Sequence, residues 1–299
     1  MVMLMLLGVL LPLFAVAYRN TFDMQTIRVP ITLNRSERLQ DKAFTPLRVL
    51  HLSDLHMENL SVKPERIMAE VEEQAIDLIA ITGDLLDRAR NIPKAIEYVS
   101  SLKQLNAPLG IFVVFGNHDY LLPAAKLAEL KRALQDIGCH VLQNETITLN
   151  YHGEKLHIIG IDDFATRRSD LARSYQGVGE EGIRLVLTHD PNVVLHMADY
   201  DYDYLLSGHF HGGQIHWPKP YHLWKMGKLP RMNVVKGLHY YDGRPFYISE
   251  GLGQTGVNIR LRSRPEITLH TLQAADQTSE AVHEQSPRME EVAPALAID

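Results

Sequence analysis

Aspartate, asparagine and histidine recur at the ends of short apolar runs along this 299-residue chain, usually beside a glycine. These side chains offer oxygen and nitrogen ligands, which suit manganese, iron or zinc better than soft metals. Seven candidates are too many for one tetrahedral ion. Two ions about 3.5–4 Å apart, sharing a water that becomes a nucleophile, are a known device for phosphoryl chemistry. The candidate ligands are Asp54, His56, Asp84, Asn117, His189, His209 and His211.

The elements around these residues are predicted to bring them to one place. Apolar runs at 47–53, 77–82 and 110–115 alternate with helical patterns at 64–75, 94–105 and 123–137, which predicts parallel strands with crossover helices. In open α/β sheets the ligand site lies beyond the carboxyl ends of the strands. After residue 141 the runs become shorter, and a second, more antiparallel sheet is expected. Its strands are predicted at 146–150, 156–161, 183–188, 204–207 and 245–249, with a last strand at 266–271.

The composition is that of a globular protein. Charged residues make up 22% of the chain and hydrophobic residues 45%, with a mean hydropathy of -0.12. These values exclude a disordered chain and a multi-span membrane protein. A single cysteine, Cys139, excludes thiolate zinc sites and an intrachain disulfide. The net charge of -6 disfavours a nucleic-acid partner.

The two ends of the chain differ from the middle. Residues 1–17 are apolar, which is about the shortest length for a membrane span, and Ala15-Val16-Ala17 leaves signal-type cleavage open. Six basic and three acidic side chains follow within 19–48, so the positive-inside rule predicts a cytoplasmic body. Residues 273–299 carry six acids and one base, which indicates a disordered tail. The remainder has a net charge near -1.

In their order along the chain, the polar blocks resemble the motifs of the calcineurin-like metallophosphoesterases. The resemblance implies an α/β fold, a four-layer α-β-β-α sandwich of two mixed sheets, with two divalent metal ions, manganese, iron or zinc. By resemblance, one metal takes Asp54, His56, Asp84 and His211, and the other takes Asp84, Asn117, His189 and His209, with Asp84 as the bridge. The expected organisation is an anchor or signal-like segment at 1–18, a linker at 19–45, the metallophosphoesterase domain at 46–272 and the tail at 273–299.

Three further residues acquire catalytic roles from the same resemblance. His118 is expected to protonate the leaving oxygen, paired with Asp87, and a histidine pKa lies near working pH. The alternative for Asp87 is a helix cap. Arg88 is a candidate for contacting a phosphate oxygen with its planar fork.

More of the chain resembles a bacterial, membrane-associated branch that includes a UDP-2,3-diacylglucosamine pyrophosphatase of lipid A synthesis. The residues concerned are the block from His209 to Gln214 and the closing segment 262–268. Gln214, His216 and Trp217 are the expected substrate contacts, although His216 stands where relatives often place arginine. The branch implies hydrolysis of a phosphodiester or pyrophosphate bond in a lipid-linked substrate at the inner membrane. The alternatives are a general phosphodiesterase or phosphatase, a nuclease of the same fold, and a non-catalytic membrane scaffold.

One stretch near the last block supports two interpretations. Residues 215–236 contain Trp217, Tyr221 and Trp224 together with five bases and no acids. This composition suits a membrane interface or an anionic lipid-linked substrate. A packed hairpin with a charged rim explains it equally well.

Overall fold

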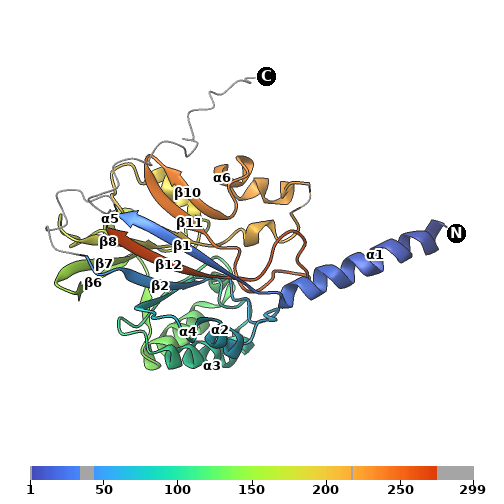
Figure 1. The fold of residues 1–299 in the computed structure, drawn as a ribbon, viewed down its shortest axis with the longest axis horizontal. Helices are drawn as coiled ribbons and strands as arrows, with labels where there is room; N and C mark the ends of the chain where they lie inside the picture. Colours follow the sequence, from blue (N-terminus) through green and yellow to red (C-terminus); the bar gives the residue numbers. More distant parts are fainter. Residues whose placement is uncertain (1, 34–43, 217, 275–299) are drawn as a thin grey trace, which may run out of the picture.

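The computed structural model describes residues 2–33, 44–216 and 218–274, and within this range two six-stranded sheets form the centre of the molecule (Figure 1). The first sheet has the order β1-β12-β2-β3-β4-β5. All neighbouring pairs are parallel except β12 with β2. Its strands are β1 (Gln25–Leu33), β2 (Leu47–Leu52), β3 (Leu78–Thr82), β4 (Ile111–Val114), β5 (His140–Leu142) and β12 (Glu266–Ala274).

The second sheet has the order β10-β11-β9-β8-β7-β6. Within the described residues the second sheet is more antiparallel than the first, as expected, because its outer pairs β10–β11 and β6–β7 are antiparallel and the first sheet has one such pair. Its central strands β11, β9, β8 and β7 run parallel. Short helices and turns, instead of full crossover helices, lie in the connections between these parallel strands, so the sequence pattern did not indicate their parallel order. The strands are β6 (Glu145–Tyr151), β7 (Glu154–Gly160), β8 (Ile183–Leu187), β9 (Tyr204–Ser207), β10 (Gly237–Tyr241) and β11 (Arg244–Ile248).

Helices cover the outer faces of both sheets, which confirms the four-layer α-β-β-α arrangement. The first sheet is covered by α2 (Pro64–Val71), α3 (Ile92–Leu102) and α4 (Ala124–Asp136), which lie together in Figure 1. Short helices cover the second sheet: α5 (Leu171–Ser174), α6 (Lys228–Arg231), and the 3-10 turns η5 (Pro191–His196) and η7 (Tyr221–Met226).

Three apolar clusters hold the layers together. One fills the space between α2–α4 and the first sheet, one lies between the two sheets, and one lies under the short helices of the second sheet. Strands β3, β4, β8 and β9 are buried at every position, which explains their continuous apolar sequence. The two sheets are therefore fixed to each other, and so are the loops at their ends.

The N-terminal segment is divided between a helix and a strand. Helix α1 (Val2–Arg19) extends away from the body (Figure 1), and the side chains of Leu10, Leu11 and Phe14 on it are more than half exposed. Within the described ranges, none of the helices combines the length and hydropathy that a membrane span requires. The expected linker at 19–45 contains β1, which pairs with β12 over all nine residues. The first sheet therefore begins before residue 46, and the expected tail beyond 274 lies outside the described residues.

Candidate metal centre

Five parallel strands end at the same place and deliver the predicted ligands to it. Asp54 and His56 follow β2, Asp84 follows β3, and Asn117 follows β4 in the first sheet. His189 follows β8, and His209 with His211 follows β9 in the second sheet. The carboxyl ends of both sheets therefore face one site, as expected for α/β folds.

The backbone at these ligands is unusual. Asp54, His56, Asp84, His209 and His211 all have positive φ, between 39° and 77°. Such conformations are uncommon for residues other than glycine and cluster at functional sites. Neighbouring glycines leave room for this crowding, since a Cβ on Gly116 would collide with the Asp84 carboxylate and one on Gly208 with Asp54.

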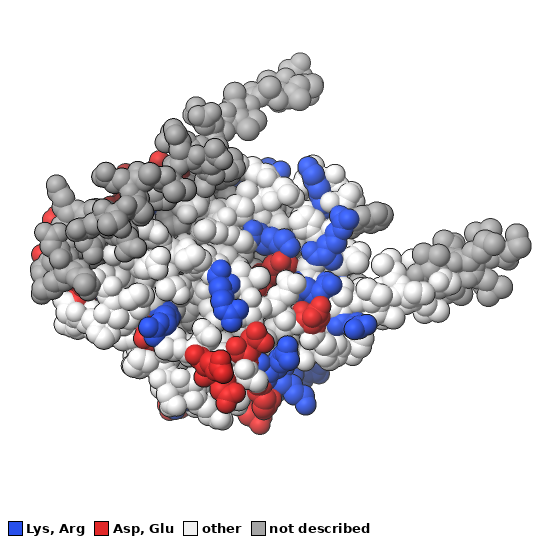
Figure 2. Space-filling model, in the orientation of Figure 1, with Lys and Arg blue, Asp and Glu red and all other residues white. Residues whose placement is uncertain are grey.

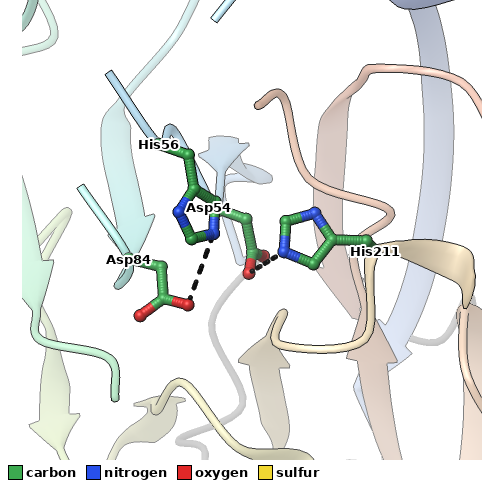
Figure 3. A group of neighbouring side chains, drawn as sticks. All are labelled: Asp54, His56, Asp84 and His211. Carbon is green, nitrogen blue, oxygen red and sulfur yellow. Dashed lines mark ion pairs between the residues drawn. The ribbon is translucent and has the colours of Figure 1, made fainter. Parts of the chain in front are cut away.

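The ligands fall into two groups that share Asp84. The first contains Asp54, His56, Asp84 and His211, whose ligand atoms all lie within 4.8 Å of one another (Figure 3). In it, His56 Nε2 lies 3.5 Å from Asp84 Oδ2, and His211 Nε2 lies 3.3 Å from Asp54 Oδ1.

The second group contains Asp84, His189 and His209 within the same limit. His189 Nε2 lies 3.1 Å from Asp84 Oδ2 and 3.2 Å from His209 Nδ1. Asp84 is thus placed to bridge two ions, as the family resemblance implied.

Hydrogen bonds on the outer side orient three of the imidazoles. The Nδ1–H groups of His56, His189 and His211 donate to Asp87 Oδ1 at 2.8 Å, the Thr82 carbonyl at 2.7 Å and the Gly253 carbonyl at 3.2 Å. Each bond fixes the tautomer and turns Nε2 inward, which is how metal-ligating histidines are held in proteins.

The donors fit divalent cations. Asn117 Oδ1 is buried without a hydrogen-bond partner, and Asn117 lines the cavity at the ligands, so a polar atom is available there for a cation. Burial lowers the pKa of His209 to about 4, and the neighbouring His189 adds to this shift, so His209 is a neutral ligand at pH 7. Carboxylate, amide and imidazole donors suit manganese, iron or zinc.

His118 and Asp87 lie at the edge of the first group. His118 Nδ1 is 3.1 Å from Asp87 Oδ1, the same oxygen that accepts from His56. Burial lowers the pKa of His118, but the contact with Asp87 and the charge of Asp84 outweigh this and leave the pKa above its usual 6.5. A protonated His118 near neutral pH suits a general acid. Asp87 therefore contacts both a ligand and the expected acid.

The structure does not place the other residues that were predicted to contact substrate as free groups in the cavity. Arg88 is exposed and does not line the cavity at the ligands, and its backbone N–H donates to Glu58. The Gln214 amide lines the cavity but is occupied, because it donates to Thr255 and Val257 and accepts from Thr255. His216 bonds the Gly212 carbonyl and lies outside the lining, and Trp217 lies outside the described residues.

A cavity of about 310 Å³ opens from the ligands toward η7. Its near wall includes Asp84, Asn117, His118, His209 and His211. Its far wall is formed by His222, Leu223, Lys225 and Met226, and the sequence pattern had not singled out His222. The basic and aromatic composition of 215–236 was the only sequence signal for this wall.

Two buried residues hold the loops of the site in place, a role that the sequence pattern did not predict. Asp119 follows His118 and accepts from the backbone N–H groups of Leu85, Leu86 and Gly116, so it joins the loops after β3 and β4. Arg260 is fully buried and donates to several backbone carbonyls of 250–264, including Gly253. Its position in a loop with no apolar period gave no sequence signal.

Comparison with known proteins gives a consistent result. A family model described as calcineurin-like phosphoesterase matches residues 47–213. The chain is 54% identical to the uncharacterized metallophosphoesterase YkoQ of Bacillus subtilis, over 88% of this chain and 96% of that protein. It is 30% identical to the phosphodiesterase YaeI of Escherichia coli, over 75% and 81%. It is 27% identical to the UDP-2,3-diacylglucosamine pyrophosphatase LpxG of Chlamydia muridarum, over 75% and 82%.

The family match covers more than half of the chain and includes all seven candidate ligands. The fold gathers six of them in two groups that share Asp84, and the seventh, Asn117, lines the cavity beside them. The chain therefore belongs to the calcineurin-like phosphoesterases and is a metal-dependent phosphoester hydrolase.

Proposed function

We propose that this hydrolase cleaves a phosphodiester or pyrophosphate bond in a lipid-linked substrate, such as UDP-2,3-diacylglucosamine, at a membrane surface. The observation that carries the proposal is the cavity, which joins the ligands to the partly apolar wall of η7. Its volume of about 310 Å³ is in the range of small-molecule pockets and accommodates more than a phosphoryl group. The name of LpxG agrees with this substrate class, and that of YaeI with a phosphodiester.

The chain contributes the metal ligands and a general acid. Asp54, His56, Asp84 and His211 would hold one ion, and Asp84, Asn117, His189 and His209 the other. When bound, the ions neutralise charge on the phosphoryl oxygens and make a water nucleophilic near neutral pH. His118 donates the proton that the leaving oxygen needs, and Asp87 holds the imidazole in position.

Attachment to the membrane is proposed through α1. Its exposed side chains include Leu10, Leu11, Leu13, Phe14 and Val16. The face in Figure 2 shows Lys and Arg side chains mainly in the half toward α1, whereas Asp and Glu gather over α2 and α3. Basic groups near a membrane anchor favour the anionic cytoplasmic leaflet.

Two exposed aromatic side chains of η7, next to the cavity, also support contact with a membrane. Tyr221 and Trp224 are 50% and 45% exposed, and their rings pack edge to face with centroids 4.9 Å apart. Aromatic side chains with one wet face are typical of membrane interfaces.

The test measures metal-dependent turnover of p-nitrophenyl phosphate, bis-p-nitrophenyl phosphate and the UDP-linked lipid. We expect the last two to be hydrolysed and Asp84→Asn to lower both bound metal and turnover. Hydrolysis of p-nitrophenyl phosphate alone would contradict the diester assignment.

The lipid-linked part has its own test in Trp224→Ser. We expect turnover of the UDP-linked lipid in vesicles to fall about tenfold, as loss of one interfacial aromatic anchor allows. Turnover of bis-p-nitrophenyl phosphate should stay within twofold, because Trp224 does not line the cavity. An equal fall for both substrates would refute the lipid-linked part.

A further inference from the structure

The far wall of the cavity contains a cation that the hydrolytic reaction does not use. Lys225 of η7 lines the same cavity as Asp84, Asn117, His209 and His211. Asp84 is the only carboxylate of the lining, and it belongs to both metal groups. Among the described residues, none is recorded in a hydrogen bond or ion pair with the Lys225 ammonium group.

The backbone that carries Lys225 is tied to the metal centre. Asn192 Nδ2 donates to the Met226 carbonyl at 2.8 Å and to Asp190 Oδ1 at 2.7 Å. Asp190 directly follows the ligand His189 and is buried with Asn192. Gly227, at φ 127°, leaves the space that the Asn192 side chain occupies. The backbone next to Lys225 is therefore fixed by buried hydrogen bonds of Asn192, which also contacts Asp190 beside the ligand His189.

The neighbours of Lys225 distinguish this wall from an ordinary surface. Leu223 and Met226 line the cavity beside it, and Leu223 is 6% exposed. Phe210 and Ile215 add apolar surface between the two walls. Lys225 itself is exposed to solvent, so its attraction for an anion is that of a hydrated, partly screened charge. His222 lies next to Lys225 and presents an imidazole to the same space.

We propose that Lys225 binds a second anionic group of the substrate, such as the phosphate that is not attacked in a diphosphate diester. Metal ions held by the ligands would bind the reacting phosphoryl group, and Lys225 binds its neighbour. The site then selects diphosphate-bridged diesters over simple phosphodiesters. This selectivity rests on the proposed phosphodiesterase function and adds the substrate class to it.

The experiment compares the metal-loaded full-length protein on two soluble substrates, bis-p-nitrophenyl phosphate with one anionic group and UDP-glucose with two. We expect Lys225→Met to raise KM for UDP-glucose about tenfold, as loss of one charge-assisted contact predicts. The kcat for UDP-glucose and both constants for bis-p-nitrophenyl phosphate should change less than twofold. Lys225→Arg should restore most of the affinity. Lys228→Met is the matched control, since Lys228 is exposed in α6 and outside the cavity.

The outcomes separate this proposal from the function on which it rests. If the wild-type protein does not hydrolyse bis-p-nitrophenyl phosphate with any divalent metal, the proposed function itself fails. If it hydrolyses that ester but not UDP-glucose, or if Lys225→Met changes both substrates alike, the second-anion site is refuted. Equal effects of Lys225→Met and Lys228→Met on UDP-glucose would refute it too, because they would reflect general surface charge.

Discussion

At the scale of single residues, two aspartates of the metal centre each contact two histidines. Asp84 contacts His56 and His189, one from each group, and Asp87 contacts His56 and His118. Desolvation opposes charge on Asp84, yet the adjacent imidazoles outweigh it and hold the pKa of that carboxyl well below its usual value. Asp84 is therefore an anion throughout the working pH range and available as a bridging ligand.

The role of His118 can be tested through the leaving group. We expect His118→Asn to lower kcat about 100-fold or more for a diester with an alkoxide leaving group, because general acid catalysis contributes about 10²–10⁴. With p-nitrophenolate, which leaves without a proton, the fall should be below tenfold. Steady-state kinetics on the two esters measure this. An equal loss on both would show that His118 acts in some other way.

At the scale of elements, the loop between β11 and β12 supports both His211 and the base of α1. The Arg260 side chain donates to Gly251 and Gly253, and the Gly253 carbonyl accepts from His211 Nδ1. The Arg260 backbone N–H donates to the Ala17 carbonyl, and its carbonyl accepts from Asn20. One buried guanidinium therefore holds a loop that reaches the metal centre and the N-terminal helix.

Replacing Arg260 should lower both the stability of the protein and its binding of metal. We expect Arg260→Met to lower the free energy of unfolding by about 3 kcal/mol, because several buried carbonyls lose their donor. Bound metal should fall in the folded fraction, because His211 loses its orientation. Urea unfolding and metal analysis measure the two effects. Arg262→Met, at an exposed position two residues away, is the control. Unchanged metal binding by a folded Arg260→Met protein would exclude the positioning role.

At the scale of the whole molecule, a buried polar cluster lies where the two sheets face each other. His51 on β2 and His270 on β12 are both fully buried, with ring centroids 5.5 Å apart. His270 Nδ1 pairs with the Tyr204 hydroxyl of the other sheet at 2.9 Å. Burial lowers the pKa of His51 to about 3 and that of His270 well below 6.5. Both imidazoles are therefore neutral in the folded protein.

This cluster predicts loss of stability in acid. The unfolded chain binds protons at these histidines below pH 6.5 while the folded protein does not, so their contribution is complete above pH 6.5 and declines as the pH falls. Each histidine should lower the free energy of unfolding by about 1 kcal/mol between pH 7 and 5.5. His270→Gln should reduce the measured difference between these pH values by that amount. His152→Gln, at an exposed position, should leave it unchanged. A pH dependence that His270→Gln does not alter would contradict the assignment.

Much of the fold and the centre could be predicted because the signals are local. The apolar runs before Asp54, Asp84 and Asn117 form strands β2, β3 and β4, within a residue or two of the expected bounds. Ligand type and spacing are also properties of short segments, and the fixed order of the motifs indicated the family.

Other features depend on residues far apart in the chain. Residues 25–33 alternate apolar with mostly polar side chains, which is typical of a half-buried strand, but the pattern does not identify the partner strand. That partner is β12, more than 230 residues later, which offers a parallel edge. The parallel order of the second sheet, the wall of η7 over the ligands and the burial of Arg260 are likewise set by packing between distant segments.

The sequence by itself determined which chemistry the chain carries, because ligand identity, glycine spacing and apolar runs are encoded locally. Only the tertiary structure decided which side chains meet, because burial and neighbours arise when the two sheets pack. In the packed structure the Gln214 amide is hydrogen-bonded within the chain, Arg88 lies outside the cavity, and Lys225 lines the same cavity as the ligands.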